Sequence, residues 1–220
     1  MGAIGSIDQF KAAVGADFAR PNLFQVDLNF PSFVTGNNTS DQGASASTLK
    51  DQGNLLVRAA NLPSSQIGIV EVPFRGRVLK IAGDRTFEPW TITIQNDTGF
   101  VLRNAFEIWL QKIQAYNENY TTWTAGSNAD AGSDKLNYFA DMYVTQLARD
   151  ARAEGGSGTS GAGSTGHKGI RKYKFVNAFP SNLAAIDLDF GNNDAIEEFT
   201  VELQVQYWEP VALDQGSVSQ

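Results

Sequence analysis

Residues 195–208 alternate apolar and polar side chains more strictly than any other segment of the chain. The two sets are Phe199, Val201, Leu203, Val205 and Tyr207 on one side, and Thr200, Glu202, Gln204, Gln206 and Trp208 on the other. Successive side chains of a β-strand point to opposite faces of its sheet. The pattern therefore predicts a long strand with one buried face and one solvated face, which is typical of antiparallel sheets.

Shorter segments predict further strands around one helix. We expect the strands at residues 23–30, 55–60, 67–74, 78–81, 86–95, 138–147, 170–179 and 183–190. Apolar residues at three- and four-residue steps predict a helix that Asp97 or Thr98 caps and that runs to about Tyr116. Its apolar stripe consists of Leu102, Ala105, Phe106, Trp109, Ile113 and Tyr116. We interpret this stripe as a face packed on a sheet, in preference to a cofactor slot.

Polar segments without an apolar period separate these elements. Residues 36–53 and 153–169 are rich in glycine and serine, which predicts two flexible insertions. Gly83-Asp84-Arg85 predicts a tight turn, and residues 1–20 predict an N-terminal arm. No repeat and no shift in composition divides the chain. We therefore expect a single domain over residues 1–220, an antiparallel β sandwich or barrel with one flanking helix and long loops.

The residue types that carry enzyme chemistry are scarce in this chain. It has no cysteine and a single histidine, His167, which lies in a Gly/Ser-rich run. Thiolate nucleophiles and cysteine-based metal sites are therefore excluded, and a histidine-based triad has little support. We expect neither catalysis nor a cofactor.

The charge and the hydropathy pattern exclude two further classes. A formal net charge of −7 argues against a protein that grips nucleic acid, because phosphate binding needs a basic excess. No segment approaches the ~20 apolar residues of a membrane-spanning helix. The N-terminus also lacks the cationic start of a secretory signal, so we expect a chain kept in a cytoplasm-like compartment.

Carboxylates gather in the C-terminal part of the chain. Two of them, Asp187 and Asp189, lie on one face of an expected strand, and three follow shortly after it: Asp194, Glu197 and Glu198. We favour a solvated strand face as the explanation. A calcium site built from these oxygens and a glycosidase-like pair of carboxylates remain open alternatives.

Four short peptides in a fixed order carry a resemblance to a known family. They are residues 17–24 (DFARPNLF), 82–87 (AGDRTF), 90–97 (WTITIQND) and 207–209 (YWE). In this order and spacing they resemble the tail tube proteins of contractile-tailed, T4-like bacteriophages. The resemblance implies a β sandwich or barrel with a helix alongside. It also implies hexameric rings that stack inside a contractile sheath into a tube through which the genome passes.

The resemblance also implies roles for particular residues. Candidates for the face that lines the tube are Asp187, Asp189, Thr200, Glu202, Gln204 and Gln206. Candidates for contacts between subunits or rings are Asp17, Phe18, Arg20, Arg75, Arg77, Asp84 and Arg85. The implied partners are further copies of the chain, the sheath protein, baseplate and tail-terminator proteins, a tape-measure protein and double-stranded DNA in the lumen, with no membrane. The implied location is the virion tail, with assembly in the host cytoplasm.

Two other functions are alternatives to a tube subunit. One is a related ring protein of a baseplate, or of a contractile injection or secretion system. The other is a hydrolase that uses the acidic cluster.

Overall fold

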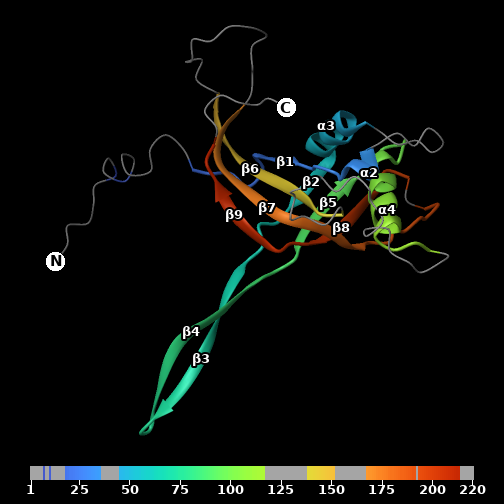
Figure 1. Cartoon of the computed structure of the whole chain (residues 1–220). Coiled ribbons are helices and arrows are strands. Elements are labelled where there is room, and N and C mark those ends of the chain that lie inside the picture. Colours follow the sequence, from blue (N-terminus) through green and yellow to red (C-terminus); the bar gives the residue numbers. More distant parts are fainter. Residues whose placement is uncertain are drawn as a thin grey trace. The chain divides into compact units, whose positions relative to one another are not determined.

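The computed structural model describes residues 7, 10, 18–35, 45–116, 138–151, 167–191 and 193–213 (Figure 1). Among them the chain is mainly antiparallel β, as predicted. The elements in order are β1 (Phe24–Asp27), α2 (Ser32–Thr35), α3 (Ala46–Leu56), β2 (Val57–Ala60), β3 (Ser65–Phe74), β4 (Arg77–Phe87), β5 (Trp90–Gln95), α4 (Val101–Ile113), β6 (Ala140–Ala151), β7 (His167–Leu183), β8 (Glu198–Gln204) and β9 (Tyr207–Val211).

Two sheets contain all the described strands. A seven-stranded sheet has the order β1-β6-β7-β8-β5-β2, and β9 pairs with β7 outside this path. The second sheet is the two-stranded pair of β3 and β4. The ladders of β2 with β5, of β5 with β8 and of β7 with β8 are antiparallel. No helix among the described residues is long and apolar enough to cross a membrane.

The chain divides into two compact units. One comprises residues 1–25, 144–173 and 210–220, and the other comprises residues 26–143 and 174–209. The second unit contains α2, α3 and α4, the hairpin of β3 and β4, and most of the buried side chains of the described residues. The single-domain organisation stays a prediction.

The centre of the core is the ladder between β5 and β8, where the predicted alternation is confirmed. The buried side chains of the two strands face one another across the ladder, as Trp90 with Leu203, Ile92 with Val201 and Ile94 with Phe199. The indole of Trp90 also stacks on the ring of Phe175, with 4.4 Å between the ring centroids. Cross-strand pairs of this kind are the main source of sheet stability.

The helix α4 buries the stripe that its sequence predicts. Leu102, Ala105, Phe106 and Trp109 are all buried. The N-cap residue is Phe100, which makes no side-chain cap bond, and the Oδ1 atom of Asp97 accepts a hydrogen bond from the N–H of Val101, the first helical residue, at 3.2 Å. The helix ends earlier than expected, at Ile113, and the side chain of Tyr116 is exposed.

The expected insertion at residues 36–53 is wrong for its second half. Residues 46–56 form the helix α3. Its N-cap residue is Ser45, whose hydroxyl accepts a hydrogen bond from the N–H of Thr48 at 3.2 Å. The helix escaped prediction because it buries few side chains, chiefly Leu49, so that its sequence carries no apolar period. The remaining residues, 36–44, lie outside the described residues, as does most of the second expected insertion.

The predicted turn at residues 83–85 is wrong, because these residues lie within β4. The pairing register shifts opposite them, between Ile67 and Ile69. A Cβ atom on Gly83 would lie 3.2 Å from the carbonyl oxygen of Gly68, so this glycine permits a close approach of two strands. The strand expected at residues 86–95 is also two strands, since β4 ends at Phe87 and β5 begins at Trp90.

The predicted strand at residues 183–190 is wrong as well. The strand β7 ends at Leu183, and residues 184–189 have no regular structure. The long strand predicted at residues 195–208 is shorter and interrupted. It becomes β8 and β9, separated by Val205 and Gln206, because the chain changes partners there: β8 lies between β5 and β7, whereas β9 pairs with β7.

Candidate assembly surfaces

The β3–β4 hairpin has no core of its own. Its strands pair with each other from Ser65 opposite Phe87 to Phe74 opposite Arg77. None of its residues is buried, although its sequence is rich in aliphatic side chains. The exposed large apolar side chains are Ile67, Ile69, Val70, Val72, Phe74, Val78, Leu79 and Ile81. An apolar surface of this extent marks an interaction site in a folded protein.

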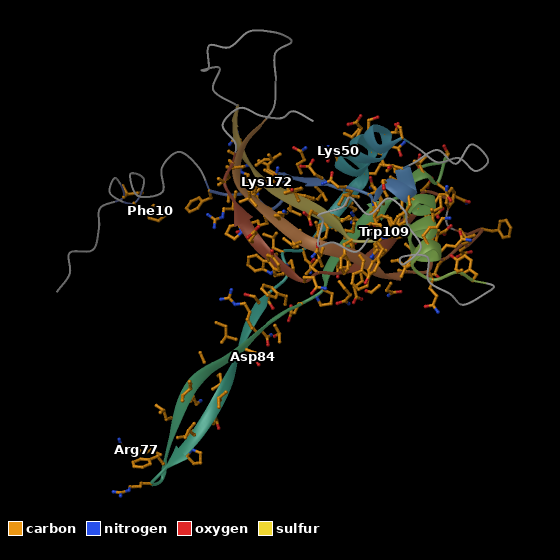
Figure 2. The ribbon with its side chains drawn as sticks, viewed as in Figure 1. Phe10, Lys50, Arg77, Asp84, Trp109 and Lys172 are labelled. Carbon is orange, nitrogen blue, oxygen red and sulfur yellow. The ribbon has the colours of Figure 1, made fainter. Side chains whose placement is uncertain are left out.

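The turn of the hairpin carries two arginines. The turn residues Arg75 and Gly76 have φ angles of 44° and 82°, the left-handed geometry that fits tight hairpin turns. The guanidinium carbon of Arg75 lies 5.4 Å from the centre of the Phe74 ring. Figure 2 shows Arg77 at the turn and Asp84 farther along the hairpin. Four of the candidate contact residues therefore lie on this one hairpin: Arg75, Arg77, Asp84 and Arg85.

The base of the hairpin is fastened to the main sheet. The N–H of Asn61 donates to the carbonyl of Thr91 at 3.2 Å, and the side-chain oxygen of Asn61 accepts from the N–H of Thr91 at 2.9 Å. The indole N–H of Trp90 donates to the carbonyl of Asn61 at 2.9 Å. Beyond it, the N–H of Glu88 donates to the carbonyl of Ser64 at 3.2 Å. These bonds fix the point at which the hairpin leaves β5.

The N-terminal candidates belong to the other compact unit. Phe18 is exposed, and the carbonyl of Arg20 accepts a hydrogen bond from the side-chain amide of Gln146 in β6 at 2.6 Å. Asp17 lies outside the described residues. The described contact candidates thus fall in both compact units.

The polar face of β8 holds three of the predicted lumen residues. Thr200, Glu202 and Gln204 are half-buried and alternate with the core side chains of the same strand. The side-chain amide of Gln204 donates to Glu202 at 3.2 Å and to the hydroxyl of Ser181 at 3.3 Å. The strand contains no lysine or arginine, although Arg58 of β2 forms an ion pair with Glu198 at its first residue.

The other lumen candidates lie off this strand. Gln206 follows β8 and is exposed, and its N–H donates to the carbonyl of Val176 at 3.2 Å. Asp187 and Asp189 lie in the connection between β7 and β8 and are exposed. The strand that would have aligned them with β8 does not exist. Within the described part of the chain, no group of three histidine, cysteine or acidic residues is placed to hold a metal ion.

Sequence reasoning missed the apolar side of this same connection. Leu188, Phe190 and Ile196 are among its most exposed side chains. Their alternation with acidic residues resembles an amphipathic strand, and this concealed that these side chains stay exposed among the residues that the structure describes. One signal of their exposure was available in the sequence. All the charged residues of the segment are acidic, which is unusual around apolar residues that are buried in a core.

The fold is shared with chains from two assemblies whose structures come from cryo-EM. One is from the cryo-EM structure of the anti-feeding prophage baseplate, with a TM-score of 0.54 and 13% identity, over 91% of this chain and 99% of that chain. The other is from the sheath/tube terminator of the PVC extracellular contractile injection system, with a TM-score of 0.53 and 12% identity, over 90% of this chain and all of that chain.

Sequence comparison identifies the family. Residues 19–210 match the phage tail tube protein family. The chain is 30% identical over 202 residues to the tail tube protein gp19 of Enterobacteria phage T4, covering 92% of this chain and 98% of that protein. It is 27% identical over 203 residues to the tail tube protein of Serratia phage KSP90, covering 91% and 94%.

The chain therefore belongs to the phage tail tube protein family. It is a tail tube protein of contractile-tailed phages and a structural component of the virion tail, so the resemblance carried by the four peptides is confirmed.

Proposed function

We propose that copies of this chain close into hexameric rings, and that the rings stack into a hollow tube within a contractile sheath. The tube conducts the viral genome into the host. The observation that supports this most directly is the β3–β4 hairpin, whose apolar side chains have no cover within the described part of the chain. Burial of such side chains against another copy removes apolar surface from water, which favours association.

The hairpin and the N-terminal segment supply the contacts between copies in this proposal. Arg75 and Arg77 act at the turn, Asp84 and Arg85 act along β4, and Asp17, Phe18 and Arg20 act near the N-terminus. Ring closure also pairs strand edges that would otherwise be open to aggregation.

The polar face of β8 lines the bore in this proposal. Thr200, Glu202 and Gln204, with Gln206 beyond them, offer neutral or acidic groups to passing DNA. A channel that conducts DNA must not hold it, and the absence of lysine and arginine from β8 suits that need.

The partners that follow are the sheath protein, baseplate and tail-terminator proteins, a tape-measure protein and double-stranded DNA inside the bore. Assembly takes place in the host cytoplasm. The subunit needs no catalysis, no cofactor and no membrane for this role.

Electron microscopy and sedimentation of the purified chain test the proposal. We expect long hollow tubes of stacked rings. Rings that never stack would favour the second candidate, a ring protein of a baseplate, which the shared fold with a baseplate chain supports. A chain that stays monomeric at high concentration, with a hydrolytic activity lost on substitution of Asp187 or Asp189, would contradict both.

Substitution within β4 tests the contact residues. Asp84→Ala and Arg85→Ala should each raise the concentration needed for tube formation by roughly tenfold, which corresponds to a loss of about 1.4 kcal/mol per contact. Lys50→Ala on α3 is the control and should assemble as the natural chain does. Normal tubes from both β4 variants would remove these two residues from the contact set.

A further inference from the structure

The connection from β7 to β8, residues 184–197, is both acidic and apolar, and most of its described residues, 184–191 and 193–197, are exposed. Asp187, Asp189, Asp194 and Glu197 are its charged residues, and it contains no lysine or arginine. Between them the side chains of Leu188, Phe190 and Ile196 are 85%, 104% and 67% exposed. Neighbouring apolar side chains at such exposure mark an interaction site.

The β3–β4 hairpin has the complementary chemistry. Its strands and turn, residues 65–87, contain four basic and two acidic residues, in a chain whose net charge is −7. One of the acids, Glu71, is engaged by Lys80 across the ladder, with 3.7 Å between the charged atoms. Three arginines then remain against one acid, Asp84, and two of the three lie at the tip of the hairpin next to the exposed Phe74 and Val78. Each surface offers what the other lacks.

The register of the main sheet places these two surfaces at opposite ends of the same strands. The hairpin joins β5 at its first residue, Trp90, which pairs with Leu203 near the end of β8. Residues 184–197 join β8 at its first residue, Glu198, which pairs with Gln95 at the end of β5. The bond from the N–H of Asn96 to the carbonyl of Glu197, at 2.9 Å, holds the segment at that end. The six residues of β5 separate the two attachment points by about 20 Å.

We propose that residues 184–197 of one copy are the acceptor for the hairpin turn of another copy. Arg75 and Arg77 lie against the carboxylates, and Leu188 and Phe190 cover the apolar side chains at the turn. A contact between unlike surfaces at opposite ends of a subunit is heterologous, and it builds an open column when the rotation between successive copies does not close into a ring. The inference rests on the proposed function, because it names the partner surface through which copies of the chain meet.

Disulfide trapping tests the contact directly, because the natural chain has no cysteine. The variant with Val78→Cys and Leu188→Cys should form disulfide-linked dimers and longer species when tubes are oxidised. The control pairs Val78→Cys with Leu55→Cys, another highly exposed position, which lies on α3, and should stay monomeric on a denaturing gel. A disulfide confined to one chain, or none in the test variant, would overturn the inference.

Charge reversal tests the energetics of the same contact. R75E/R77E and D187K/D189K should each reduce sedimentable assembly by at least tenfold, because each sets like charges against one another. An equimolar mixture of the two variants should assemble again, since each supplies the surface that suits the other. The chain with all four changes should also assemble alone. Lys50→Glu is the control for a change of charge elsewhere, and circular dichroism checks that every variant is folded.

The outcomes separate the inference from the proposed function. If the natural chain forms tubes and both reversal variants form them equally well, the inference is wrong and the tube proposal stands. If the natural chain forms no tubes at all, the proposed function itself fails. If each reversal variant fails alone and the mixture fails too, the two surfaces do not meet and the inference is wrong.

Discussion

Asp141 bonds to residues of two other segments within the second compact unit. Its carboxylate lies 3.1 Å from the ammonium nitrogen of Lys174, and it accepts a hydrogen bond from the N–H of Asn177 at 3.0 Å. Asn177 has a φ angle of 54°, a left-handed conformation that costs free energy in a strand. The carbonyl of Asp141 accepts from the side-chain amide of Asn29 at 2.8 Å. One residue thus connects β6, β7 and the segment after β1.

Loss of the charge at this position should destabilise the fold. In Asp141→Asn the amide oxygen still accepts from Asn177, so the change isolates the ion pair with Lys174. We expect the free energy of unfolding at pH 8 to fall by about 2 kcal/mol, which is typical of a hydrogen bond to a charged group. Urea unfolding of the unassembled chain measures it. Asp141→Ala should lower the free energy of unfolding further, because it also removes the acceptor for the N–H of Asn177. An equal loss for the two variants would contradict this explanation.

The same pair makes stability depend on alkaline pH. The hydrogen bond that the ammonium of Lys174 donates to the carboxylate of Asp141 raises the pKa of Lys174 above its ordinary value, and burial opposes part of that rise. The folded chain then binds this proton more tightly than the unfolded chain does. The stabilisation is fully present below the pKa of an unfolded lysine, about 10.4, and is lost as the pH rises through the folded value. The difference in unfolding free energy between the natural chain and Asp141→Asn should therefore shrink above that pH.

None of this could be predicted from the sequence. Asp141 and Lys174 are separated by a segment whose length says nothing about the pairing of β6 with β7. The left-handed conformation of Asn177 also cannot be predicted from the sequence, because the surrounding residues have the pattern of an ordinary strand. Sequence periodicity identifies the face on which a side chain lies, and it does not identify its neighbour on another strand.

Helices and strands were predicted correctly where their apolar residues recur with a clear period and also pack against another part of the fold. The strands β5 and β8 and the helix α4 were predictable because their apolar residues recur at the period of the element and lie against the core. Residues 185–190 continue the same alternation, but none of the described strands pairs with them. The helix α3 has partners and almost no apolar period. The period reports which face would be buried, and tertiary neighbours decide whether the element forms.

The helix α4 should contribute much of the core stability through Trp109. Its indole is fully buried, packs edge-on against Phe30 with 5.7 Å between centroids, and donates to the carbonyl of Tyr138 at 2.9 Å. Trp109→Ala should lower the free energy of unfolding by about 4 kcal/mol, as large-to-small changes in cores do. Tyr116→Ala, just beyond the helix, should change it by less than about 0.5 kcal/mol. Urea midpoints of the two variants measure the difference, and similar midpoints would show that α4 does not anchor the core.

At the scale of the whole molecule, the distribution of charge matters more than its sum. The basic residues of the hairpin lie at one end of β5, while the carboxylates of residues 184–197 lie at the other. Between them β8 is free of basic side chains. The net charge of −7 predicted weak binding of nucleic acid, but it could not reveal this separation, because separation depends on strand register. The family, in contrast, was readable from short peptides alone.

The proposed bore should bind DNA when a positive charge is introduced on the polar face of β8. Tubes of Glu202→Lys should capture short duplex DNA at low salt and release it as salt rises, because the added cation displaces counterions from phosphate. Asp51→Lys on the exposed face of α3 makes the same change of charge away from β8 and should capture none inside the tube. Nuclease protection of the captured DNA measures its location. Equal protection by the two variants would show that the polar face of β8 does not line the channel.

The attachment of the hairpin and of residues 184–197 at opposite ends of β5 gives each copy a direction. A column built by such copies has one terminus with unoccupied hairpins and another with unoccupied acidic segments. The two termini therefore differ chemically, and a protein shaped to start the column is the wrong shape to stop it. Initiation and length control then need two different surfaces, one that binds unoccupied hairpins and one that binds unoccupied acidic segments.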